Sequence, residues 1–106
     1  MTDKYIYQLL AEVCKALAHG IRIEIIDLLQ DREMGFREIF EKTGIAKSSL
    51  SQHLSVMVEK GILIQRKEGI NSYYRVSTDK VSKACQLMRE VLIEKLEKST
   101  EILKKI

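Results

Sequence analysis

The 106-residue sequence predicts a mainly α-helical fold with one small β-hairpin. Three observations support this fold class. Apolar residues recur at the helical spacing of i, i+3, i+4 and i+7 over segments that precede residue 61. Residues 62–77 are richer in β-branched and aromatic side chains, around a glycine-containing turn. A long helical stripe follows from about residue 79 to 105. Since one core usually serves about 100–200 residues, we assign residues 1–106 to a single domain.

The first two helices are separated by His19-Gly20. Apolar positions of the first helix are Ile6, Leu9, Leu10, Val13, Cys14 and Leu17. Inward positions of the second are Ile21, Ile25, Ile26, Leu28 and Leu29. We predict that Arg22 faces outward with Glu24, Asp27 and Gln30, and that it has a structural role in which it pairs with an acidic neighbour.

The third and fourth helices form a helix-turn-helix over about residues 35–60. The third begins near Gly35, buries Phe36, Ile39 and Phe40, and ends at Thr43-Gly44, because glycine readily adopts the left-handed turn on which helices often end. The fourth runs from about residue 47 to 60 and ends before Gly61. Its buried positions are Leu50, Leu54 and Met57.

A basic hairpin, or wing, follows at about residues 62–77. Its strands are residues 62–67 and 72–77, and residues 68–71 form the turn. We expect Tyr74 to point inward and Arg75 outward.

The last helix, at about residues 79–105, carries more apolar surface than a small domain covers by itself. Its stripe consists of Val81, Cys85, Met88, Leu92, Leu96, Ser99, Leu103 and Ile106. We therefore predict that part of this stripe meets a second chain, with a long helix folded back on its own core as the alternative.

Composition and charge exclude several protein classes. The sequence is 45% hydrophobic and 31% charged, which is typical of a globular protein. No apolar run could cross a bilayer, the first residues lack a signal-peptide layout, and two cysteines are too few for a disulfide scaffold. Nucleotide-binding, zinc-protease and nucleophile–base motifs are absent. We predict a cytoplasmic protein with reduced thiols that is not an enzyme and has no membrane partner.

The fourth helix has the residue types expected of a helix that reads the major groove. Serine lets the helix approach closely, glutamine can form two hydrogen bonds with adenine, and lysine can reach guanine or phosphate. Residues 36–75 carry a net charge of +3, whereas residues 1–35 carry −2. A solvated surface with a slight basic excess is the alternative reading. The predicted DNA contacts are Lys47, Ser48, Ser49, Ser51, Gln52, His53, Arg66, Lys67, Asn71, Tyr73 and Arg75.

His53 has two readings of equal weight. It either contacts phosphate or a base, or it only packs and caps.

Over about residues 10–80, the chain resembles the ArsR/SmtB family of winged helix repressors. The segments that carry the likeness are Cys14-Lys15-Ala16-Leu17-Ala18, Arg22 with residues 25–29, residues 48–54, residues 60–63, residues 66–69 and Tyr73-Tyr74-Arg75-Val76. The resemblance implies a homodimeric transcriptional repressor that dimerises through its first and last helices. The interface residues that we predict on these helices are Ile6, Leu10, Val81, Met88, Leu92 and Leu96. The resemblance also implies that a small inducer, often a metal ion, releases the DNA.

The sequence departs from this family at the inducer sites. The cysteine-bearing metal motif of the third helix would fall on Gly35 and Arg37, and the last helix has no histidine for the second metal site. A cysteine used by persulfide-sensing members would fall near Asp27. Ala46 stands where a helix-capping serine is common, and His19-Gly20 replaces the usual Asp/Asn-Pro turn. The usual metal sites are therefore missing, while a metal inducer remains an option.

Cys14 and Cys85 are the candidate sensor thiols. If the outer helices meet at the dimer seam, the two could form a switch for thiol oxidants, reactive sulfur or a thiophilic metal. The favoured alternative is that both are small buried hydrophobic residues. Whether they meet within one chain or across the dimer is left open.

The sequence as a whole predicts a homodimeric regulator, a repressor that binds palindromic double-stranded DNA and is released by a small inducer. The alternatives are a winged helix module for protein–protein interaction without specific DNA binding, and a metal- or sulfur-handling protein in which the thiols are the function.

Overall fold

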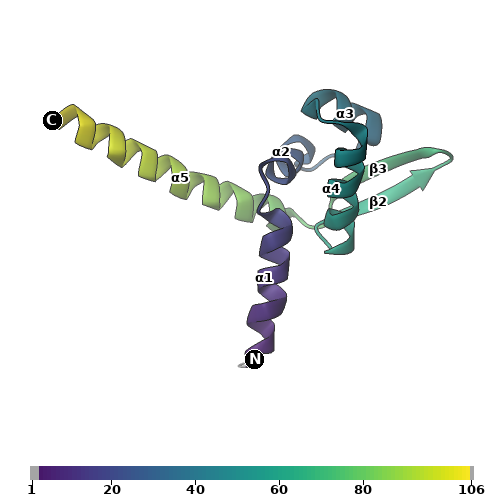
Figure 1. The fold of residues 1–106 in the computed structure, drawn as a ribbon, viewed down its shortest axis with the longest axis horizontal. Coiled ribbons are helices and arrows are strands. Elements are labelled where there is room, and N and C mark those ends of the chain that lie inside the picture. Colours follow the sequence, from purple (N-terminus) through teal and green to yellow (C-terminus); the bar gives the residue numbers. More distant parts are fainter. Residues whose placement is uncertain (1–2, 106) are drawn as a thin grey trace.

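The computed structural model describes residues 3–105 and is mainly helical with a small antiparallel sheet, as predicted. Figure 1 shows a central body from which α1 and α5 extend in different directions. In chain order the elements are α1 (Tyr5–Leu17), α2 (Gly20–Leu29), β1 (Met34–Gly35), α3 (Phe36–Thr43), α4 (Lys47–Glu59), β2 (Leu63–Glu68), β3 (Asn71–Val76) and α5 (Asp79–Lys105).

The sheet has three strands in the order β1-β3-β2, so the prediction of a two-stranded hairpin alone was incomplete. β2 and β3 form the predicted hairpin, with Leu63 opposite Val76 and Glu68 opposite Asn71. β1 adds Met34 opposite Tyr74 on the other edge of β3. A two-residue strand shows no alternation in sequence, because its formation depends on a partner far along the chain.

The core lies between α2, α3, α4 and the sheet. Tyr74 is buried and Arg75 exposed, so the predicted orientation of β3 is confirmed. Apart from Ala16, the buried apolar residues belong to the segment from α2 to β3. They are Ala16, Ile25, Ile26, Leu29, Met34, Ile39, Leu50, Leu54, Met57, Ile62, Leu63, Tyr74 and Val76.

The prediction for Arg22 was wrong in both orientation and partner. Its side chain is buried and donates hydrogen bonds to His53 Nδ1 and to the carbonyl oxygen of Ala16, not to a carboxylate. Arg22 precedes Ile25, Ile26 and Leu29 by three, four and seven residues, which places it on the buried face of α2. Its charge suggested exposure, but the periodicity of the helix decides its position.

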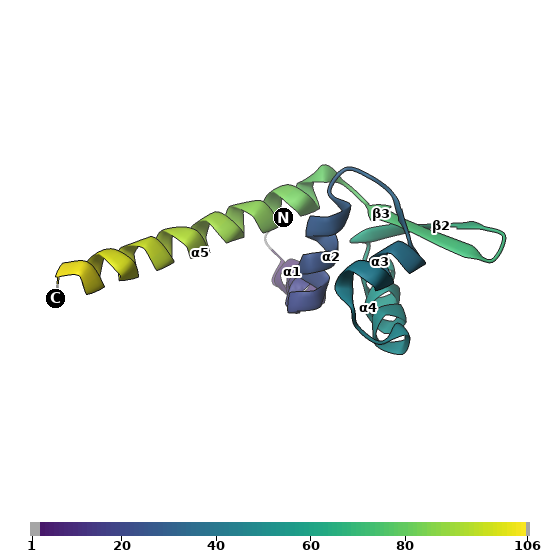
Figure 2. The same cartoon turned by 90° about the horizontal axis from the view of Figure 1, so that it is seen from above.

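α5 has no buried residue. Only its first turns meet the body: Val81 and Cys85 pack against the core, and Arg89 forms an ion pair with Asp27 of α2 at 3.3 Å. Beyond that contact the helix extends away from the body, as both views show, rather than folding back on it (Figures 1 and 2). Ile106 of the predicted stripe lies outside the described residues. Among residues 3–105, no helix is both long enough and apolar enough to span a bilayer.

Candidate nucleic-acid interface

α3 and α4 are joined by a sharp turn that begins at Gly44. Gly44 has φ of 69°, a left-handed conformation that glycine adopts without a Cβ penalty, and its N–H donates to the carbonyl oxygen of Phe40. The Thr43 hydroxyl donates to the carbonyl oxygen of Ile39 at 2.9 Å. Ala46 then precedes α4 in an extended conformation without a side-chain cap. This turn fixes the direction in which α4 leaves α3.

α4, the recognition helix, has one fully buried face and one exposed face. Leu50, Leu54 and Met57 have no exposed surface and anchor the helix in the core. The predicted contact residues of its first two turns are all exposed: Lys47, Ser48, Ser49, Ser51 and Gln52. Lys47 Nζ lies 5.5 Å from the centre of the Phe40 ring, a cation–π distance. The arrangement presents short polar side chains on a rigid helix surface.

His53 belongs to the same helix but lies between these two faces. Its ring is half-buried, and its Nδ1 accepts a hydrogen bond from Arg22 Nε at 3.0 Å. Burial, with smaller contributions from the charges of Arg22 and His19, lowers the pKa of His53. Of the two predicted roles for His53, the described contact is the packing one.

The wing presents most of its predicted contact residues to solvent. Lys67, Asn71 and Arg75 are exposed, and Tyr73 is half-buried. Gly69 at the tip has φ of 62°, and Ile70 beside it is fully exposed. Among residues 3–105, neither Lys67 nor Arg75 lies within ion-pair distance of a carboxylate, so both cations are open to an anionic partner.

A shallow hollow of about 350 Å³ separates the wing from the start of α3. Its lining consists of Gly35, Phe36 and Arg37 on one side and residues 70–73 on the other. The surface between the wing and the start of α3 is therefore indented rather than flat.

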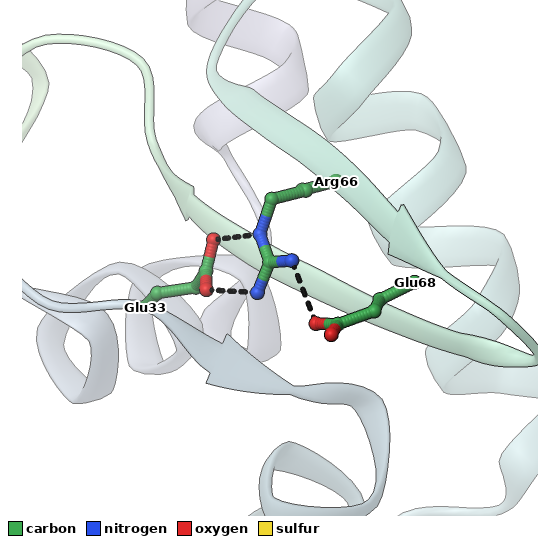
Figure 3. Close-up of polar contacts among 3 residues, drawn as sticks. All are labelled: Glu33, Arg66 and Glu68. Carbon is green, nitrogen blue, oxygen red and sulfur yellow. Dashed lines mark hydrogen bonds and ion pairs between the residues drawn. The ribbon is translucent and has the colours of Figure 1, made fainter.

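Arg66 differs from the other cations of the wing, because two carboxylates hold its guanidinium (Figure 3). Glu33 accepts from Nε at 3.1 Å and from Nη2 at 2.7 Å, and Glu68 accepts from Nη1 at 2.9 Å. The guanidinium also lies 4.5 Å from the centre of the Tyr73 ring. The hydrogen bond from Arg66 lowers the pKa of Glu33, and the two carboxylates raise that of Arg66.

Glu33 was not among the predicted site residues. It lies far from Arg66 in sequence, and no local spacing rule connects two such positions. The paired carboxylates offset the positive charge that Arg66 was predicted to offer to phosphate.

A family model described as bacterial regulatory protein, arsR family, matches residues 19–65. The HTH-type transcriptional regulator Rv0081 of Mycobacterium tuberculosis is 31% identical over 104 residues, which is 97% of this chain and 91% of that protein. This chain belongs to the arsR family of bacterial regulatory proteins. The family consists of DNA-binding regulators of transcription rather than enzymes, so the predicted family and general function are confirmed.

Solved structures of arsR-family relatives share the fold. The crystal structure of Rv0081 superposes with a TM-score of 0.81 and covers 90% of this chain and 96% of its own. The solution structure of Mb0332 from Mycobacterium bovis, a homodimeric winged helix-turn-helix DNA-binding domain, has a TM-score of 0.78 and 32% identity. It covers 89% of this chain and 88% of its own. The predicted winged helix-turn-helix class is thereby confirmed.

Residues at the family's thiolate metal positions do not fit a metal in this arsR-family chain. Gly35 is the residue that precedes α3, and Arg37 forms an ion pair with Glu41 at 3.2 Å. Among residues 3–105, no three side chains of His, Cys, Asp or Glu gather as a metal site would require.

The two candidate thiols have different surroundings. Both are free; Cys14 on α1 is exposed, whereas Cys85 on α5 is half-buried against the core. Burial raises the pKa of the Cys85 thiol, despite the opposing charge of Arg89. Since the thiolate is the reactive form, this surrounding makes Cys85 less reactive at neutral pH.

Proposed function

We propose that the chain is a homodimeric, sequence-specific repressor of the arsR family. The observation that carries this proposal is the recognition helix, whose buried face is locked in the core while its polar start is exposed. Such a helix presents hydrogen-bonding side chains in a fixed register, as reading of the major groove requires. Because a regulator of this kind acts on DNA, we assign it to the cytoplasm.

Base reading is assigned to the first two turns of α4. Gln52 can bind an adenine edge through two hydrogen bonds, and Ser48 and Ser51 are short enough to let the helix approach. Lys47 and Ser49 add contacts to phosphate or base edges. Lys67, Asn71, Tyr73 and Arg75 of the wing would meet the backbone, where contacts give affinity and register.

The outer helices support the proposal of a dimer. Leu10 of α1 and Met88, Leu92 and Leu96 of α5 are exposed apolar residues, whereas Ile6 is half-buried. Val81, also predicted at the interface, packs against the chain's own core. A surface of this kind on a small domain favours a second copy, and Mb0332 is a homodimer with the same fold. Two recognition helices would then enter major grooves about 10 bp apart in a palindromic operator.

Release of the DNA would follow from binding of a small inducer. Such a molecule must bind the DNA-free dimer more tightly, and DNA must weaken its binding by the same factor. Oxidants and reactive sulfur would meet Cys14, the exposed thiol, before the half-buried Cys85, and a thiophilic metal would need ligands beyond these two.

Fluorescence anisotropy with the duplex upstream of the protein's own gene tests DNA reading, at one salt concentration and with a scrambled duplex as competitor. We expect tighter binding to the upstream duplex than to the scrambled duplex. Gln52→Ala should reduce the free-energy preference for the correct base at one position by about 1–3 kcal/mol. Gln86→Ala, an exposed glutamine of α5, is the matched control and should keep selectivity. Equal binding to both duplexes would refute the proposal and favour a protein-interaction module.

The same isotherm after mild thiol oxidation tests the inducer class. Loss of binding on oxidation, absent in a Cys14→Ser, Cys85→Ser double variant, would assign the thiols to sensing. DNA binding that is unchanged by oxidation would exclude both cysteines from sensing.

A further inference from the structure

Arg22 is the one buried charged side chain among residues 3–105, with 9% of its surface exposed. No carboxylate lies within ion-pair distance of it in that part of the chain. A buried cation is costly unless hydrogen bonds compensate its lost hydration. Arg22 Nη1 donates to the carbonyl oxygen of Ala16 at 3.2 Å, and Nε donates to His53 Nδ1 at 3.0 Å. Each of these two acceptors belongs to a different helix.

The first acceptor lies in the last turn of α1. The last four carbonyl groups of an α-helix have no partner within the helix, and that end carries a partial negative charge. The Arg22 guanidinium therefore satisfies one of these carbonyl groups and adds a favourable charge at the same point. This contact fixes the end of α1 to α2.

The second acceptor lies on the recognition helix. Because a guanidinium only donates hydrogen bonds, Nδ1 of His53 must be unprotonated for the contact to form. The neutral ring then carries its proton on Nε2. A protonated His53 would place a donor against a donor and a cation against a cation.

The groups that face the His53 ring reinforce this requirement. Arg22 comes from α2, and His19 from the turn before it, with the two imidazole centres 5.8 Å apart. On α1, Glu12 is paired at 3.6 Å with Lys60, the residue that follows α4. Burial, and after it the charge of Arg22, lower the pKa of His53, so the contact is intact at neutral pH.

We propose that Arg22 is a positioning residue for DNA binding: through neutral His53 it holds the recognition helix against the end of α1, and protonation of His53 releases that helix from its DNA-binding position. The proposal rests on the DNA-binding function above. It assigns His53 to the support of α4 rather than to the phosphate backbone, and the two assignments predict opposite effects of acid.

Acidification separates the two assignments. A histidine that touches phosphate gains charge in acid and strengthens DNA binding. A histidine that must stay neutral for Arg22 weakens binding instead. Between pH 7.5 and 5.0, at fixed salt, we expect the affinity for the protein's own upstream duplex to fall about threefold to tenfold.

Two variants identify the group that titrates. His53→Asn keeps an acceptor near the position of Nδ1 but does not titrate, so the ratio of its affinities at the two pH values should be close to one. His19→Asn is the matched control, because it removes the neighbouring imidazole, and it should retain the fall. An affinity that rises or stays flat in the unmodified protein, or an equal fall in His53→Asn, would overturn the proposal.

NMR of the DNA-free protein provides a second measurement that does not depend on variant folding. The Arg22 Nε–H signal should disappear with the same midpoint as the titration of the His53 ring, and a signal that persists below that midpoint would also refute the contact. If the protein does not bind the upstream duplex more tightly than the scrambled one at pH 7.5, the proposed DNA-binding function itself is refuted. If binding is selective but its affinity does not fall in acid, only the proposed role of Arg22 is refuted.

Discussion

Many apolar side chains are buried in the body from α2 to β3, whereas many of those on the two outer helices are exposed to solvent. In the body, Leu29, Ile39 and Leu54 have no exposed surface, whereas in α5 Met88 is 67% and Leu92 is 54% exposed. The chain therefore completes the scaffold of the recognition helix by itself. It leaves the surface of the outer helices for a second molecule. Stability of the body should thus depend on its own packing, and the function of the outer helices on association.

The largest expected effect comes from a cavity in the body. Leu54→Ala truncates a fully buried side chain of the recognition helix and should lower the free energy of unfolding by about 2–5 kcal/mol. Urea denaturation measures this change. Ser55→Ala, at the exposed neighbouring position, is the control and should differ little from the unmodified protein. A loss below about 1 kcal/mol for Leu54→Ala would mean that the body does not form a closed core around this side chain.

A charge on α5 should separate association from folding. Leu92→Asp would bury a carboxylate twice in a symmetric dimer, raising the dimer dissociation constant by about a hundredfold, or roughly 3 kcal/mol. Analytical ultracentrifugation would show that the variant is a monomer, while its circular dichroism spectrum would keep the helical signal of the unmodified protein. Glu94→Lys also changes the charge of α5, but lies round the opposite side of the helix, and should leave the dimer intact. Dimers that persist in Leu92→Asp would place the interface elsewhere.

A smaller effect concerns the surface cations of the two regions. Lys67→Ala in the wing should reduce the salt dependence of DNA binding by about one phosphate contact and weaken all sequences equally. Lys98→Ala on α5 should leave the slope unchanged. Anisotropy titrations over a range of salt concentrations measure both. An unchanged slope for Lys67→Ala would remove the wing from the DNA interface.

The smallest expected effect is a change in the carboxylate pKa of two exposed ion pairs, one in the body and one on α5. Arg66 lowers the pKa of Glu33 in the body, and Lys83, 2.9 Å away, lowers that of Asp79 in α5. A lowered carboxylate pKa means that each pair stabilises the fold above the ordinary pKa and that this contribution is lost as the pH falls through the lowered value. We expect Arg66→Gln to raise the pKa of Glu33, as seen by NMR.

The titrations of Glu33 and Asp79 should also differ in which amide NMR signals they shift. Protonation of Glu33 should shift the amide signals of the wing, because Arg66 joins the two segments. Protonation of Asp79 should affect only the first turns of α5. Wing signals that do not change during the titration of Glu33 would contradict the pairing of Glu33 with Arg66 shown in Figure 3.

Periodicity and glycine positions predicted most of the fold. The buried spacing of Leu50, Leu54 and Met57 also determined that Ser48, Ser51 and Gln52 are exposed. What the sequence could not predict depends on distant partners. β1 has only two residues, and its strand character comes from pairing with β3.

The misassigned arginine and the missed glutamate have the same explanation. The charge of Arg22 suggested exposure, but helical spacing placed it against His53, on another helix. Glu33 is brought to Arg66 by the sheet. Neither pairing leaves a signal within a short window of sequence.

The pairing of Met34 with Tyr74 closes a loop that contains both helices of the helix-turn-helix and most of the wing. A contact between residues so distant along the chain forms slowly, because the entropy of loop closure is lost before the pairing is gained. Once formed, it makes α3, α4 and the hairpin one cooperative unit. We therefore expect the amides of this unit to exchange with solvent together, and those in the far half of α5 to exchange independently and earlier.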